Sequence, residues 1–598
     1  MQHSETFLWK IGAPAGFGVM TTGVGMSKLT ARHGYHLFDY TEYPSLIQGG
    51  HNTYEVHISA DPIKANKKSI DCLICLNEDT WHLHRHRLEH DSLLVFDPQE
   101  FDPKTSEVKN VPIPFQQLLN DLKAPKIALN MVSLGASLAL LGGDISYLDE
   151  MIDDQFRKKS EEIVAINQAA AGAGYTYAQE HFGELCRPVL DRSQVADRLD
   201  EAGKAHDPLT VLAGNDAFSL GAIAADARFY AAYPMSPSSS VIAIMAAWAE
   251  KQGLVARHAE DEIGVINEAL GAAHVGARAS VGTSGGGFAL MVESLSYAGV
   301  AEIPIVVFLA QRPGPATGMP TWTEQGDLLF AAHGGHGEFP KIILAPGDIE
   351  EMLALTPKAF NLADIYQTPV VILSDKLLSE SHHSVPASAV HAELSKHAVD
   401  RGKTISEKPY PDKKYMRYAD SPEDGISPRL LPGAVDAFYQ ANSYEHLADS
   451  HTTEDAADRV QQVDKRSRKM TTYLETDFAS PEVFGSLEEA QIALVSWGGN
   501  KGAIWRAQAL LAEDGIKTAF IHFTHVYPLN AGSLKPFFAQ DLPYLLIENN
   551  STGQFGQLLR QQTGIDLPEK LLKYDGRPIF PEEIEKTVLK LLSTESQL

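Results

Sequence analysis

Apolar residues along the chain occur in short continuous runs, and longer segments of mixed polarity separate them. In the first part, residues 1–195, the runs "TFLWKIG", "YHLFDY", "NTYEVHIS" and "CLICLN" predict strands. The segment "VMTTGVGMSKLTARHG" predicts a helix that ends at Gly34, because glycine commonly follows the last helical turn. This alternation of strands and helices predicts an α/β fold with a parallel, doubly wound sheet.

The same alternation returns twice, so several doubly wound domains are expected. Residues 207–390 contain the strand-like runs "PLTVLAGN", "ARFYAAYP", "ARASVGT", "IPIVVFLAQR" and "TPVVILSD". Between them, "VARHAEDEIGVINEALGAAHVG" and "FALMVESLSYAG" predict helices, with "SGGG" as a loop. Residues 486–598 add the strands "AQIALVSWG", "IKTAFIHF" and "LPYLLIEN". The intervening residues 391–485 are charged and partly proline-rich, which predicts either an extended connection wrapped over its neighbours or a flexible linker.

One segment combines prolines and serines with a long apolar run: "YPMSPSSSVIAIMAAWAE", residues 233–250. Ser236 is a favoured helix N-cap and Pro237 a favoured first helical residue. The run that follows is apolar on all sides, which predicts a buried helix. Because the segment follows a predicted strand, its hydroxyls lie where open α/β sheets bind ligands. The serines therefore either satisfy backbone groups or face a ligand pocket.

Length and charge narrow the class of protein. A chain of 598 residues suggests three or four domains. Its 50 Lys and Arg against 77 Asp and Glu give a net charge of −27, which argues against nucleic acid and anionic membranes as partners. No apolar run approaches the roughly 18 residues of a membrane span, and the N-terminus lacks the pattern of a signal peptide. We therefore expect a cytoplasmic protein.

Two small groups of residues suggest metal or phosphate sites only weakly. Cys72 and Cys75 form a CxxC, but they lie in an apolar run typical of a buried strand, so a structural role is favoured. Three cysteines are too few for a four-cysteine iron–sulfur cluster. The histidines of "WHLHRHRLEH" lack an HExxH pattern, which favours a solvated helix face over a metal site. The glycines of "GAPAGFG" form either a tight turn or a phosphate-binding helix start.

Motifs in several segments, in a fixed order, resemble the 2-oxoacid:ferredoxin oxidoreductases. "YPMSPSSS" resembles the family's YPxTPSS motif, and "HAEDEIGVINEALGAAHVGARASVGTSGGGFALMVESL" resembles its acidic helix and strand–TSGxG–helix unit. "AQRPGPATGMPTWTEQGDL" resembles its RxGPSTGxPT-type loop, and "YMRYADSPEDGISPRLLPG" and "DKRSRKM" match the segment that follows. "SWGGNKGAIWRA" and "ENNSTGQFGQL" resemble its last domain.

The resemblance covers nearly the whole chain and implies a division into domains. Residues 1–195 resemble the family's gamma subunit, here fused ahead of alpha. Residues 207–390 would form the pyrimidine-binding domain of a thiamine diphosphate enzyme, and residues 391–485 an extended connection. Residues 486–598 would form a domain like the C-terminal domain of transketolase.

The family decarboxylates a 2-oxoacid, passes two electrons through iron–sulfur chemistry to ferredoxin, and transfers the acyl group to coenzyme A. Thiamine diphosphate needs a buried carboxyl beside a nitrogen of its pyrimidine ring. By resemblance this residue is Glu262, the second Glu of "EDE". Without the family, Glu262 and its neighbours Glu260 and Asp261 are equally well explained as acids that stabilise a helix N-terminus.

Residues for the substrate are also implied by the resemblance. A 2-oxoacid carboxylate is best bound by a guanidinium, and Arg312 ends a predicted buried strand where it enters a Gly/Pro loop. Thr317 matches the family's loop threonine, and Ser236 stands where the family usually has threonine. Tyr233 and Pro234, from the same motif, are expected to contact the cofactor.

The chain lacks one signature of thiamine enzymes. The sequence GDG followed by Asn, which binds the diphosphate and its magnesium ion, does not occur. Together with the low cysteine count, this predicts that a separate beta subunit supplies the Mg²⁺ site and a 4Fe-4S cluster. No metal site is expected on this chain, and coenzyme A is expected as co-substrate.

The chain also departs from the family near its start. "GAPAGFGV" stands where relatives usually have GxGGQGV, and Leu46 and Gln48 replace a usual Glu and Arg. The order of gamma before alpha resembles 2-oxoglutarate and broad-range 2-oxoacid enzymes more than the single-chain pyruvate enzymes. We expect 2-oxoglutarate as substrate, converted with coenzyme A to succinyl-CoA and CO2 by a heterotetramer of two alpha and two beta subunits. Pyruvate, indolepyruvate or broad-range enzymes of the family, a lipoamide-linked dehydrogenase, and a non-catalytic assembly subunit remain alternatives.

Overall fold

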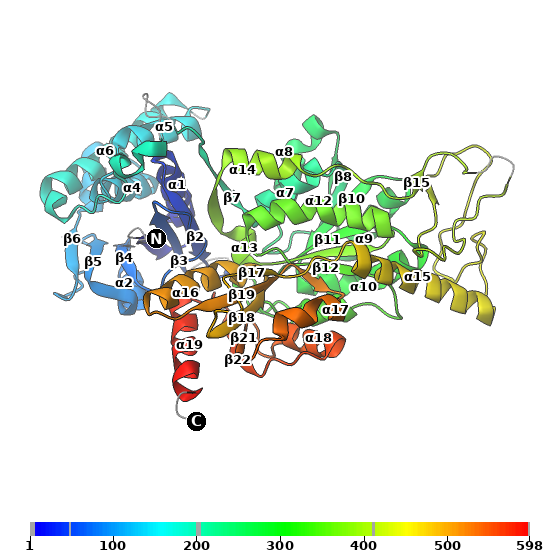
Figure 1. The fold of residues 1–598 in the computed structure, drawn as a ribbon. Coiled ribbons are helices and arrows are strands. Elements are labelled where there is room, and N and C mark those ends of the chain that lie inside the picture. The colour runs from blue at the N-terminus through cyan, green and yellow to red at the C-terminus, as the bar shows by residue number, and fades with distance from the viewer. Residues whose placement is uncertain (1–5, 47–49, 159, 199–204, 410–412, 596–598) are drawn as a thin grey trace. The chain divides into compact units, whose positions relative to one another are not determined.

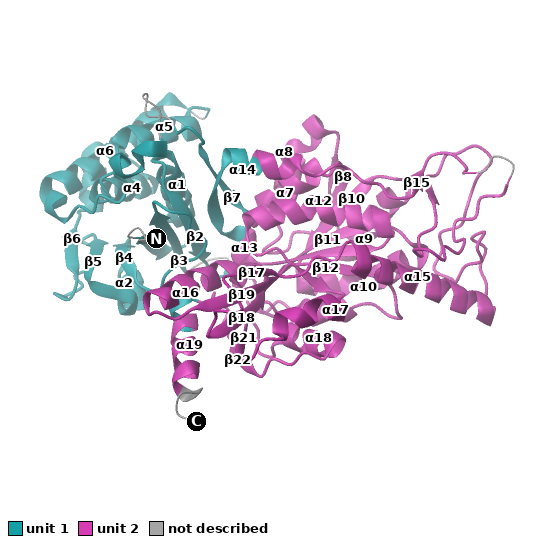
Figure 2. Ribbon diagram, in the orientation of Figure 1, with its two compact units in different colours: residues 1–213, 380–390, 580–583 teal, residues 214–379, 391–579, 584–598 magenta. Residues whose placement is uncertain are grey.

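The computed structural model describes residues 6–46, 50–158, 160–198, 205–409 and 413–595. The chain forms two compact units (Figure 2). The first unit comprises residues 1–213, 380–390 and 580–583, and the second comprises residues 214–379, 391–579 and 584–598. Gln48, one of the two departures near the start, lies outside the described residues. Within the part of the chain described, no helix is long and apolar enough to cross a membrane.

The first unit is built on an eight-stranded sheet with the order β6-β5-β4-β1-β3-β2-β14-β7 (Figure 1). Its strands are β1 (Phe7–Pro14), β2 (His36–Glu42), β3 (His51–Ser59), β4 (Ile70–Cys75), β5 (Leu88–Phe96), β6 (Lys109–Pro112), β7 (Leu209–Ala213) and β14 (His382–Pro386). Its helices are α1 (Val19–Arg32), α2 (Glu78–His84), α3 (Phe115–Leu122), α4 (Leu129–Leu140), α5 (Ile145–Phe156) and α6 (Glu161–Phe182).

Only half of this sheet is parallel. β1, β4, β5 and β6 run parallel, as the alternation of strands and helices predicts. β3 is antiparallel to both β1 and β2, and β14 is antiparallel to both β2 and β7. The expectation of a parallel sheet throughout this part is therefore wrong, because β2 and β3 follow each other directly with no helix between them.

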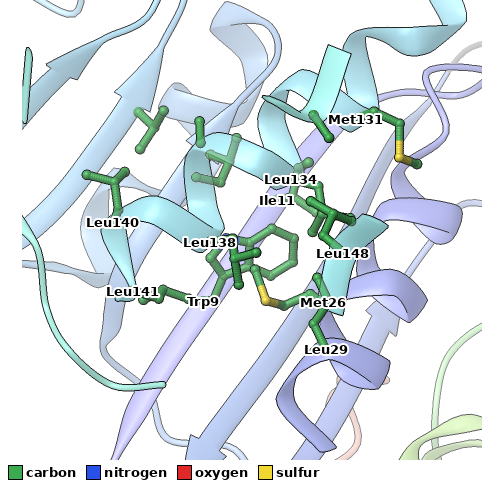
Figure 3. Packing of buried hydrophobic residues seen from close by; sticks show 14 of the residues in the cluster. Trp9, Ile11, Met26, Leu29, Met131, Leu134, Leu138, Leu140, Leu141 and Leu148 are labelled. Carbon is green, nitrogen blue, oxygen red and sulfur yellow. The ribbon is translucent and has the colours of Figure 1, made fainter. Parts of the chain in front are cut away.

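The core of the first unit lies between β1 and the helices α1 and α4, as Figure 3 shows. Trp9 and Ile11 on β1 and Leu138 on α4 are completely buried. The indole N–H of Trp9 donates to the hydroxyl of Ser137, 3.1 Å away, so its one polar atom is satisfied. Trp9 and Ile11, two residues apart in "TFLWKIG", thus lie on the face of β1 that packs on the helices.

Strand β14 joins this sheet although it comes from residues 382–386. The backbone N–H of His382 donates to Oδ1 of Asp39 at 2.7 Å, and its ring Nδ1 lies 3.0 Å from Oδ2. Ser27 and Tyr54 also donate to this buried carboxylate. These contacts hold the pKa of Asp39 below its usual value despite its burial. The two ends of the predicted region 207–390, β7 and β14, thus pair within the first unit, and the domain division from sequence stays a prediction.

Within the described residues, the second unit contains three sheets. A seven-stranded sheet has the order β20-β12-β13-β11-β10-β8-β9, a five-stranded sheet has the order β17-β19-β18-β21-β22, and β15 and β16 form a two-stranded sheet. The strands are β8 (Ala227–Ala232), β9 (Val255–His258), β10 (Arg278–Thr283), β11 (Ile305–Gln311), β12 (Ile342–Leu344), β13 (Pro369–Asp375), β15 (Thr404–Ile405), β16 (Arg429–Leu430), β17 (Glu482–Phe484), β18 (Ile492–Trp497), β19 (Thr518–Phe523), β20 (His525–Tyr527), β21 (Tyr544–Glu548) and β22 (Glu569–Leu572).

The helices of this unit are α7 (Gly214–Ala224), α8 (Ser240–Gln252), α9 (Glu262–His274), α10 (Gly285–Ala301), α11 (Leu328–His333), α12 (Ile349–Tyr366), α15 (Ala456–Thr476), α16 (Lys501–Glu513), α17 (Ala531–Leu534) and α18 (Gln554–Thr563). Helices α13 (Lys376–Glu380), α14 (Ala387–Ser395) and α19 (Pro581–Glu595) run across the boundaries of the two units. The seven-stranded sheet is parallel except for β20, its antiparallel edge strand from the C-terminal region.

Three element boundaries differ from the sequence prediction. Helix α8 begins at Ser240, four residues after the predicted N-cap Ser236, and Pro237 lies in a turn whose preceding peptide bond is cis. Residues 255–258 form strand β9 and not the start of a helix, so α9 begins at Glu262. The glycines of "SGGG" are the first turn of α10 and not a loop.

Helix α8 is also less buried than its composition predicts. Only Val241 and Met245 are fully buried, and Trp248 remains 37% exposed. The prediction of a buried helix is therefore wrong for this chain taken alone. An apolar helix that this chain covers on only one side leaves its other face without a partner within the described residues.

Described residues of the predicted connection 391–485 pack against the end of α10. Lys465 and Lys469 on α15 are buried, and each Nζ lies 2.6 Å from an oxygen of Glu302. Arg417, also buried, donates to the carbonyl of Glu302 at 2.9 Å. These cations hold the pKa of Glu302 well below its usual range. The motifs "YMRYADSPEDG" and "DKRSRKM" therefore anchor the extended connection to the end of α10.

The cysteines of the CxxC pattern are buried, and the histidines of the histidine-rich segment have different environments. Cys72 and Cys75 are free and buried in β4, and burial raises the pKa of both thiols. The histidine-rich segment divides over α2, a short 3-10 turn and β5, so the expected single helix face does not exist. His84 is buried, with its Nε2 3.1 Å from Nε2 of His51, whereas His90 is exposed on β5.

Candidate active site

Three neighbouring strands of the second unit end at one edge of the seven-stranded sheet. β8, β10 and β11 are parallel and adjacent, so the segments that follow them, residues 233–239, 284–287 and 312–327, meet there. All site residues predicted from the sequence, apart from Glu262 on α9, lie in the first and third of these segments. The edge is therefore the candidate active site.

Glu262 is the one buried acid of the "EDE" segment. Asp261 is the N-cap of α9, where its side chain accepts from the N–H of Gly264 at 2.7 Å, and Glu260 is exposed. Glu262 is only 4% exposed, and its Oε1 has no hydrogen-bond partner among the described residues. Helix capping therefore explains Asp261. It does not explain Glu262, because one buried carboxyl oxygen of this residue has no hydrogen-bond partner among the described residues.

The turn "SGGG" forms a surface of backbone against which two carboxyls lie. A methyl group on Gly287 would lie 2.6 Å from Oε1 of Glu262 and would also meet the hydroxyl of Thr283. A methyl group on Gly285 would lie 2.5 Å from Oδ2 of Asp327. Between them, Gly286 has only the carbonyl of Ala316 near its Cβ position, at 3.9 Å. Side chains at 285 and 287 would therefore displace the two acids.

This arrangement fits the pyrimidine ring of thiamine, which the resemblance implies. Such a ring needs a buried carboxyl oxygen to pair with its nitrogen and a flat surface against which to lie. Oε1 of Glu262 is an unpaired buried oxygen, and the side-chain-free turn lies beside it. The residues present are thus suited to the cofactor's ring.

Arg312 and Ser236 are brought together. Nη1 of Arg312 donates to the backbone carbonyl of Ser236 at 2.7 Å. Apart from this bond, the described residues give the guanidinium no hydrogen-bond partner, so its remaining N–H groups are available to a ligand. Burial lowers the pKa of Arg312, and the charge of Asp327 opposes this shift. The contact uses the carbonyl of Ser236 and leaves its hydroxyl for another partner.

Thr317, Tyr233 and Pro234 lie at the same edge but are exposed. The loop of Thr317 is held by a bond from the N–H of Met319 to the carbonyl of Pro313 at 3.0 Å. Tyr233 is 39% exposed, and its ring lies 6.2 Å from that of His258. The described part of this chain therefore does not enclose these three side chains.

Three further residues of the site were not singled out from the sequence. Asn215, buried at the start of α7, donates to the carbonyl of Pro237 at 2.8 Å and to the hydroxyl of Ser240 at 2.7 Å, and so holds the serine-rich segment. Asp327 and Glu324 lie in the segment after Arg312. Burial raises the pKa of Asp327 to about 6 and that of Glu324 to about 7.

A fourth such residue, Gln325, ties the substrate loop to the C-terminal region. Its Nε2 donates to the carbonyl of Trp497 at 2.9 Å. Its Oε1 accepts from the side chain of Asn500 at 2.7 Å and from the N–H of Asn549 at 3.0 Å. The motifs "SWGGN" and "ENN" thus hold the loop through hydrogen bonds to Gln325.

Large apolar side chains surround the site and are exposed to solvent in this chain. They lie on the segment after β8, on α9, α10 and α11, and on the loop after Arg312: Tyr233, Ile263, Leu290, Met319 and Phe330, each at least 36% exposed. No group of three or more His, Cys, Asp or Glu within the described ranges could hold a metal ion.

Family models match both parts of the chain. A model described as "Pyruvate flavodoxin/ferredoxin oxidoreductase, thiamine diP-bdg" matches residues 220–465, which include all the candidate site residues except Asn215. A model described as "Pyruvate ferredoxin/flavodoxin oxidoreductase" matches residues 8–177.

Relatives match over nearly the full length. The chain is 32% identical to 2-oxoacid:ferredoxin oxidoreductase 2, subunit alpha, of Aeropyrum pernix, over 98% of this chain and 97% of that relative. It is 28% identical to the 2-oxoglutarate synthase subunit KorA of Methanothermobacter thermautotrophicus, over 63% of this chain and 97% of that relative. A solved structure of 2-oxoglutarate:ferredoxin oxidoreductase from Magnetococcus marinus, with 2-oxoglutarate, coenzyme A and succinyl-CoA bound, is 29% identical and superposes with a TM-score of 0.87 over 98% of this chain and 99% of that chain.

Proposed function

The chain belongs to the family of 2-oxoacid:ferredoxin oxidoreductase alpha subunits, and from this premise we propose that it supplies the pyrimidine-binding and substrate-binding half of a 2-oxoglutarate:ferredoxin oxidoreductase. The enzyme would convert 2-oxoglutarate and coenzyme A to succinyl-CoA and CO2 and reduce ferredoxin, in either direction. The observation that carries the proposal is the buried, unpaired oxygen of Glu262 beside the side-chain-free turn.

Thiamine diphosphate, when bound, supplies a carbon nucleophile for the 2-oxo group and accepts the electrons that decarboxylation releases. Glu262 would hold a proton between its carboxyl and a nitrogen of the pyrimidine ring. Burial makes this hydrogen bond strong, because water does not compete for the carboxyl oxygen. Tyr233 and Pro234, at the end of β8, would contact the same cofactor.

Arg312 would bind the carboxylate of the 2-oxoacid. Its bond to the carbonyl of Ser236 fixes the guanidinium plane and leaves N–H groups for a bidentate contact. The hydroxyls of Ser236 and Thr317 would complete the carboxylate site. Serine at 236 keeps the hydroxyl of the family's threonine and removes its methyl group, so the pocket is larger at that point.

The other half of the active site would come from a beta subunit. The sequence lacks the GDG…N signature for the diphosphate and Mg²⁺, and three cysteines cannot ligate a 4Fe-4S cluster through four thiolates. The exposed apolar residues around the site, such as Ile263 and Leu290, suit burial against such a partner. Ferredoxin and coenzyme A would then bind to a complex whose active site is formed by both chains.

The choice of 2-oxoglutarate rests on two observations. The relative KorA is named as a 2-oxoglutarate synthase subunit, and the Magnetococcus marinus structure is described as having 2-oxoglutarate bound. Other relatives carry only the broader name 2-oxoacid:ferredoxin oxidoreductase. Pyruvate, indolepyruvate or a range of 2-oxoacids is therefore the second candidate for the substrate.

Co-expression with a beta subunit of the family tests the proposal. The purified complex should reduce ferredoxin or a viologen with 2-oxoglutarate and coenzyme A, and more efficiently than with pyruvate or indolepyruvate. Glu262→Ala should lower kcat by about 100-fold or more, whereas Glu260→Ala, at the exposed acid nearby, should not. Arg312→Ala should mainly raise KM for the 2-oxoacid. No activity with any 2-oxoacid would refute an enzymatic role, and full activity of both variants would favour an assembly subunit.

A further inference from the structure

Asp327 has the position of a helix cap but does not act as one. It is the N-cap of α11, yet its side chain accepts no hydrogen bond from that helix. Its backbone N–H donates instead to Oε1 of Gln311 at 2.9 Å, next to Arg312 in sequence. Its carboxyl is turned toward the backbone of Gly285, where a Cβ would lie 2.5 Å from Oδ2. The side chain is therefore directed into the site.

One oxygen of this carboxyl is buried and unpaired. Oδ2 of Asp327 has no hydrogen-bond partner within the described part of the chain. Two charged groups near this carboxyl lie in the segment 312–327. Arg312 attracts the carboxylate. The pKa of Glu324 is raised by burial and by the negative charge of Asp327. No ion pair within 4.0 Å joins Asp327 to Arg312 in the described ranges, so the carboxylate is only partly compensated.

We propose that Asp327 is a positioning residue that takes up one proton from solvent when a 2-oxoacid carboxylate binds to Arg312. The proposal rests on the function proposed above. In the empty site the charges of Asp327 and Arg312 attract each other. In the occupied site the substrate carboxylate binds Arg312, and the proton removes the repulsion between that carboxylate and the carboxyl of Asp327.

The sign of the pH dependence follows from this exchange. Burial raises the pKa of Asp327 to about 6 in the empty site, and a bound carboxylate raises it further because like charges disfavour ionisation. The protonated form then binds the substrate more tightly than the ionised form. KM for the 2-oxoacid should therefore rise as pH increases above about 6, and it should level off above the pKa of the occupied site.

The first test is the pH profile of KM in the assembled holoenzyme. If the bound carboxylate raises the pKa of Asp327 by one unit, KM rises about fivefold between pH 6 and pH 8. Asp327→Asn, which is neutral and nearly isosteric, should give a KM that is flat over this range and lower than that of the native enzyme at pH 8. KM for coenzyme A should be unchanged. Glu324→Gln removes a nearby carboxyl of the same loop and should keep the rise.

The second test measures the proton directly and needs no variant. Oxamate and N-oxalylglycine are unreactive mimics of a 2-oxoacid, and their binding to the holoenzyme can be followed by calorimetry in buffers of different ionisation enthalpy. The native protein should take up about half a proton at pH 6.5, and Asp327→Asn should take up none.

Two results would overturn the proposal. One is a native complex that binds the mimic without proton uptake. The other is an Asp327→Asn enzyme whose KM follows pH as the native enzyme does. Either result in a complex that still oxidises a 2-oxoacid rejects only the role of Asp327, whereas absence of turnover with every 2-oxoacid rejects the proposed function.

Discussion

Gly287→Ala moves the predicted cofactor-activating carboxyl without changing any functional group. The added methyl group would lie 2.2 Å from Oγ1 of Thr283, 2.6 Å from Oε1 of Glu262 and 2.7 Å from Cγ of Glu262, all well inside contact distance. Because Glu262 is buried, its side chain has to shift by roughly 1 Å to make room, and a shift of that size costs about 100-fold in rate at a catalytic group. We expect kcat to fall by about that factor.

The stability effect of Gly287→Ala is expected to be small. Overpacking costs about 1–3 kcal/mol, and replacing glycine by alanine within a helix returns up to about 1 kcal/mol. Gly172→Ala on α6 is the matched control, because its Cβ position is open, and it should stabilise the protein slightly with unchanged turnover. The assay is 2-oxoacid-dependent viologen reduction by the assembled complex, with urea unfolding alongside. A folded Gly287→Ala enzyme with native kcat would refute the placement of Glu262.

Three other substitutions test separate parts of the structure. Glu302→Ala leaves Lys465 and Lys469 as uncompensated buried cations and should lower the free energy of unfolding by about 3–5 kcal/mol in urea titrations; native stability would contradict this. Gln325→Ala removes the side-chain bonds to the C-terminal region, should cost about 1–3 kcal/mol and should raise KM for the 2-oxoacid; an unchanged KM would mean that the loop needs no such support. Ser236→Thr should keep turnover but change the ratio of kcat/KM between large and small 2-oxoacids by about tenfold, and an unchanged ratio would separate residue 236 from the pocket.

Several central strands of the second unit could be predicted because their apolar runs are buried on both faces. The runs "IPIVVFLAQR" and "TPVVILSD" correspond to the neighbouring strands β11 and β13, whose residues are all buried. Continuous apolar runs of this kind occur mainly in parallel sheets covered on both sides. Because neighbouring parallel strands end at the same edge of a sheet, the same runs also predict the edge at which the segments after β8, β10 and β11 meet.

The sheet of the first unit could not be predicted in full, because strand direction leaves no mark in a single apolar run. β3 is antiparallel to β1 and β2, and β14 arrives from residues 382–386, far from its neighbour β2 in the sequence. Its contact depends on Asp39 and His382, which only the folded chain brings together.

Burial of α8 was predicted incorrectly for a related reason. Its composition is that of an enclosed helix, whereas this chain covers only the side of Val241 and Met245. The helix start was also misplaced, because Ser236 and Pro237 have the residue types of a helix N-terminus but lie in a turn held by Asn215. Residue preference cannot separate a cap from a turn that a distant side chain fixes.

The site was predictable only where a motif contains the functional residue. Glu262 and Arg312 came from the family resemblance, and local spacing alone left Glu262 equivalent to two neighbouring acids. Asp327 lies within the quoted loop "TEQGDL" but has the sequence features of an ordinary helix cap. Its role became visible only from the unpaired oxygen and from the backbone of Gly285 beside it.

The central claim is that Glu262 of this chain acts on a cofactor that the assembled complex holds. Exchange of the thiazolium C2 hydrogen of bound thiamine diphosphate in deuterated buffer, followed by rapid quench and NMR, measures this action without substrate. We predict that Glu262→Gln slows the exchange by about 100- to 10,000-fold in a complex that still binds the cofactor, while Glu260→Gln leaves it at the native rate. Exchange at the native rate in Glu262→Gln would contradict the claim.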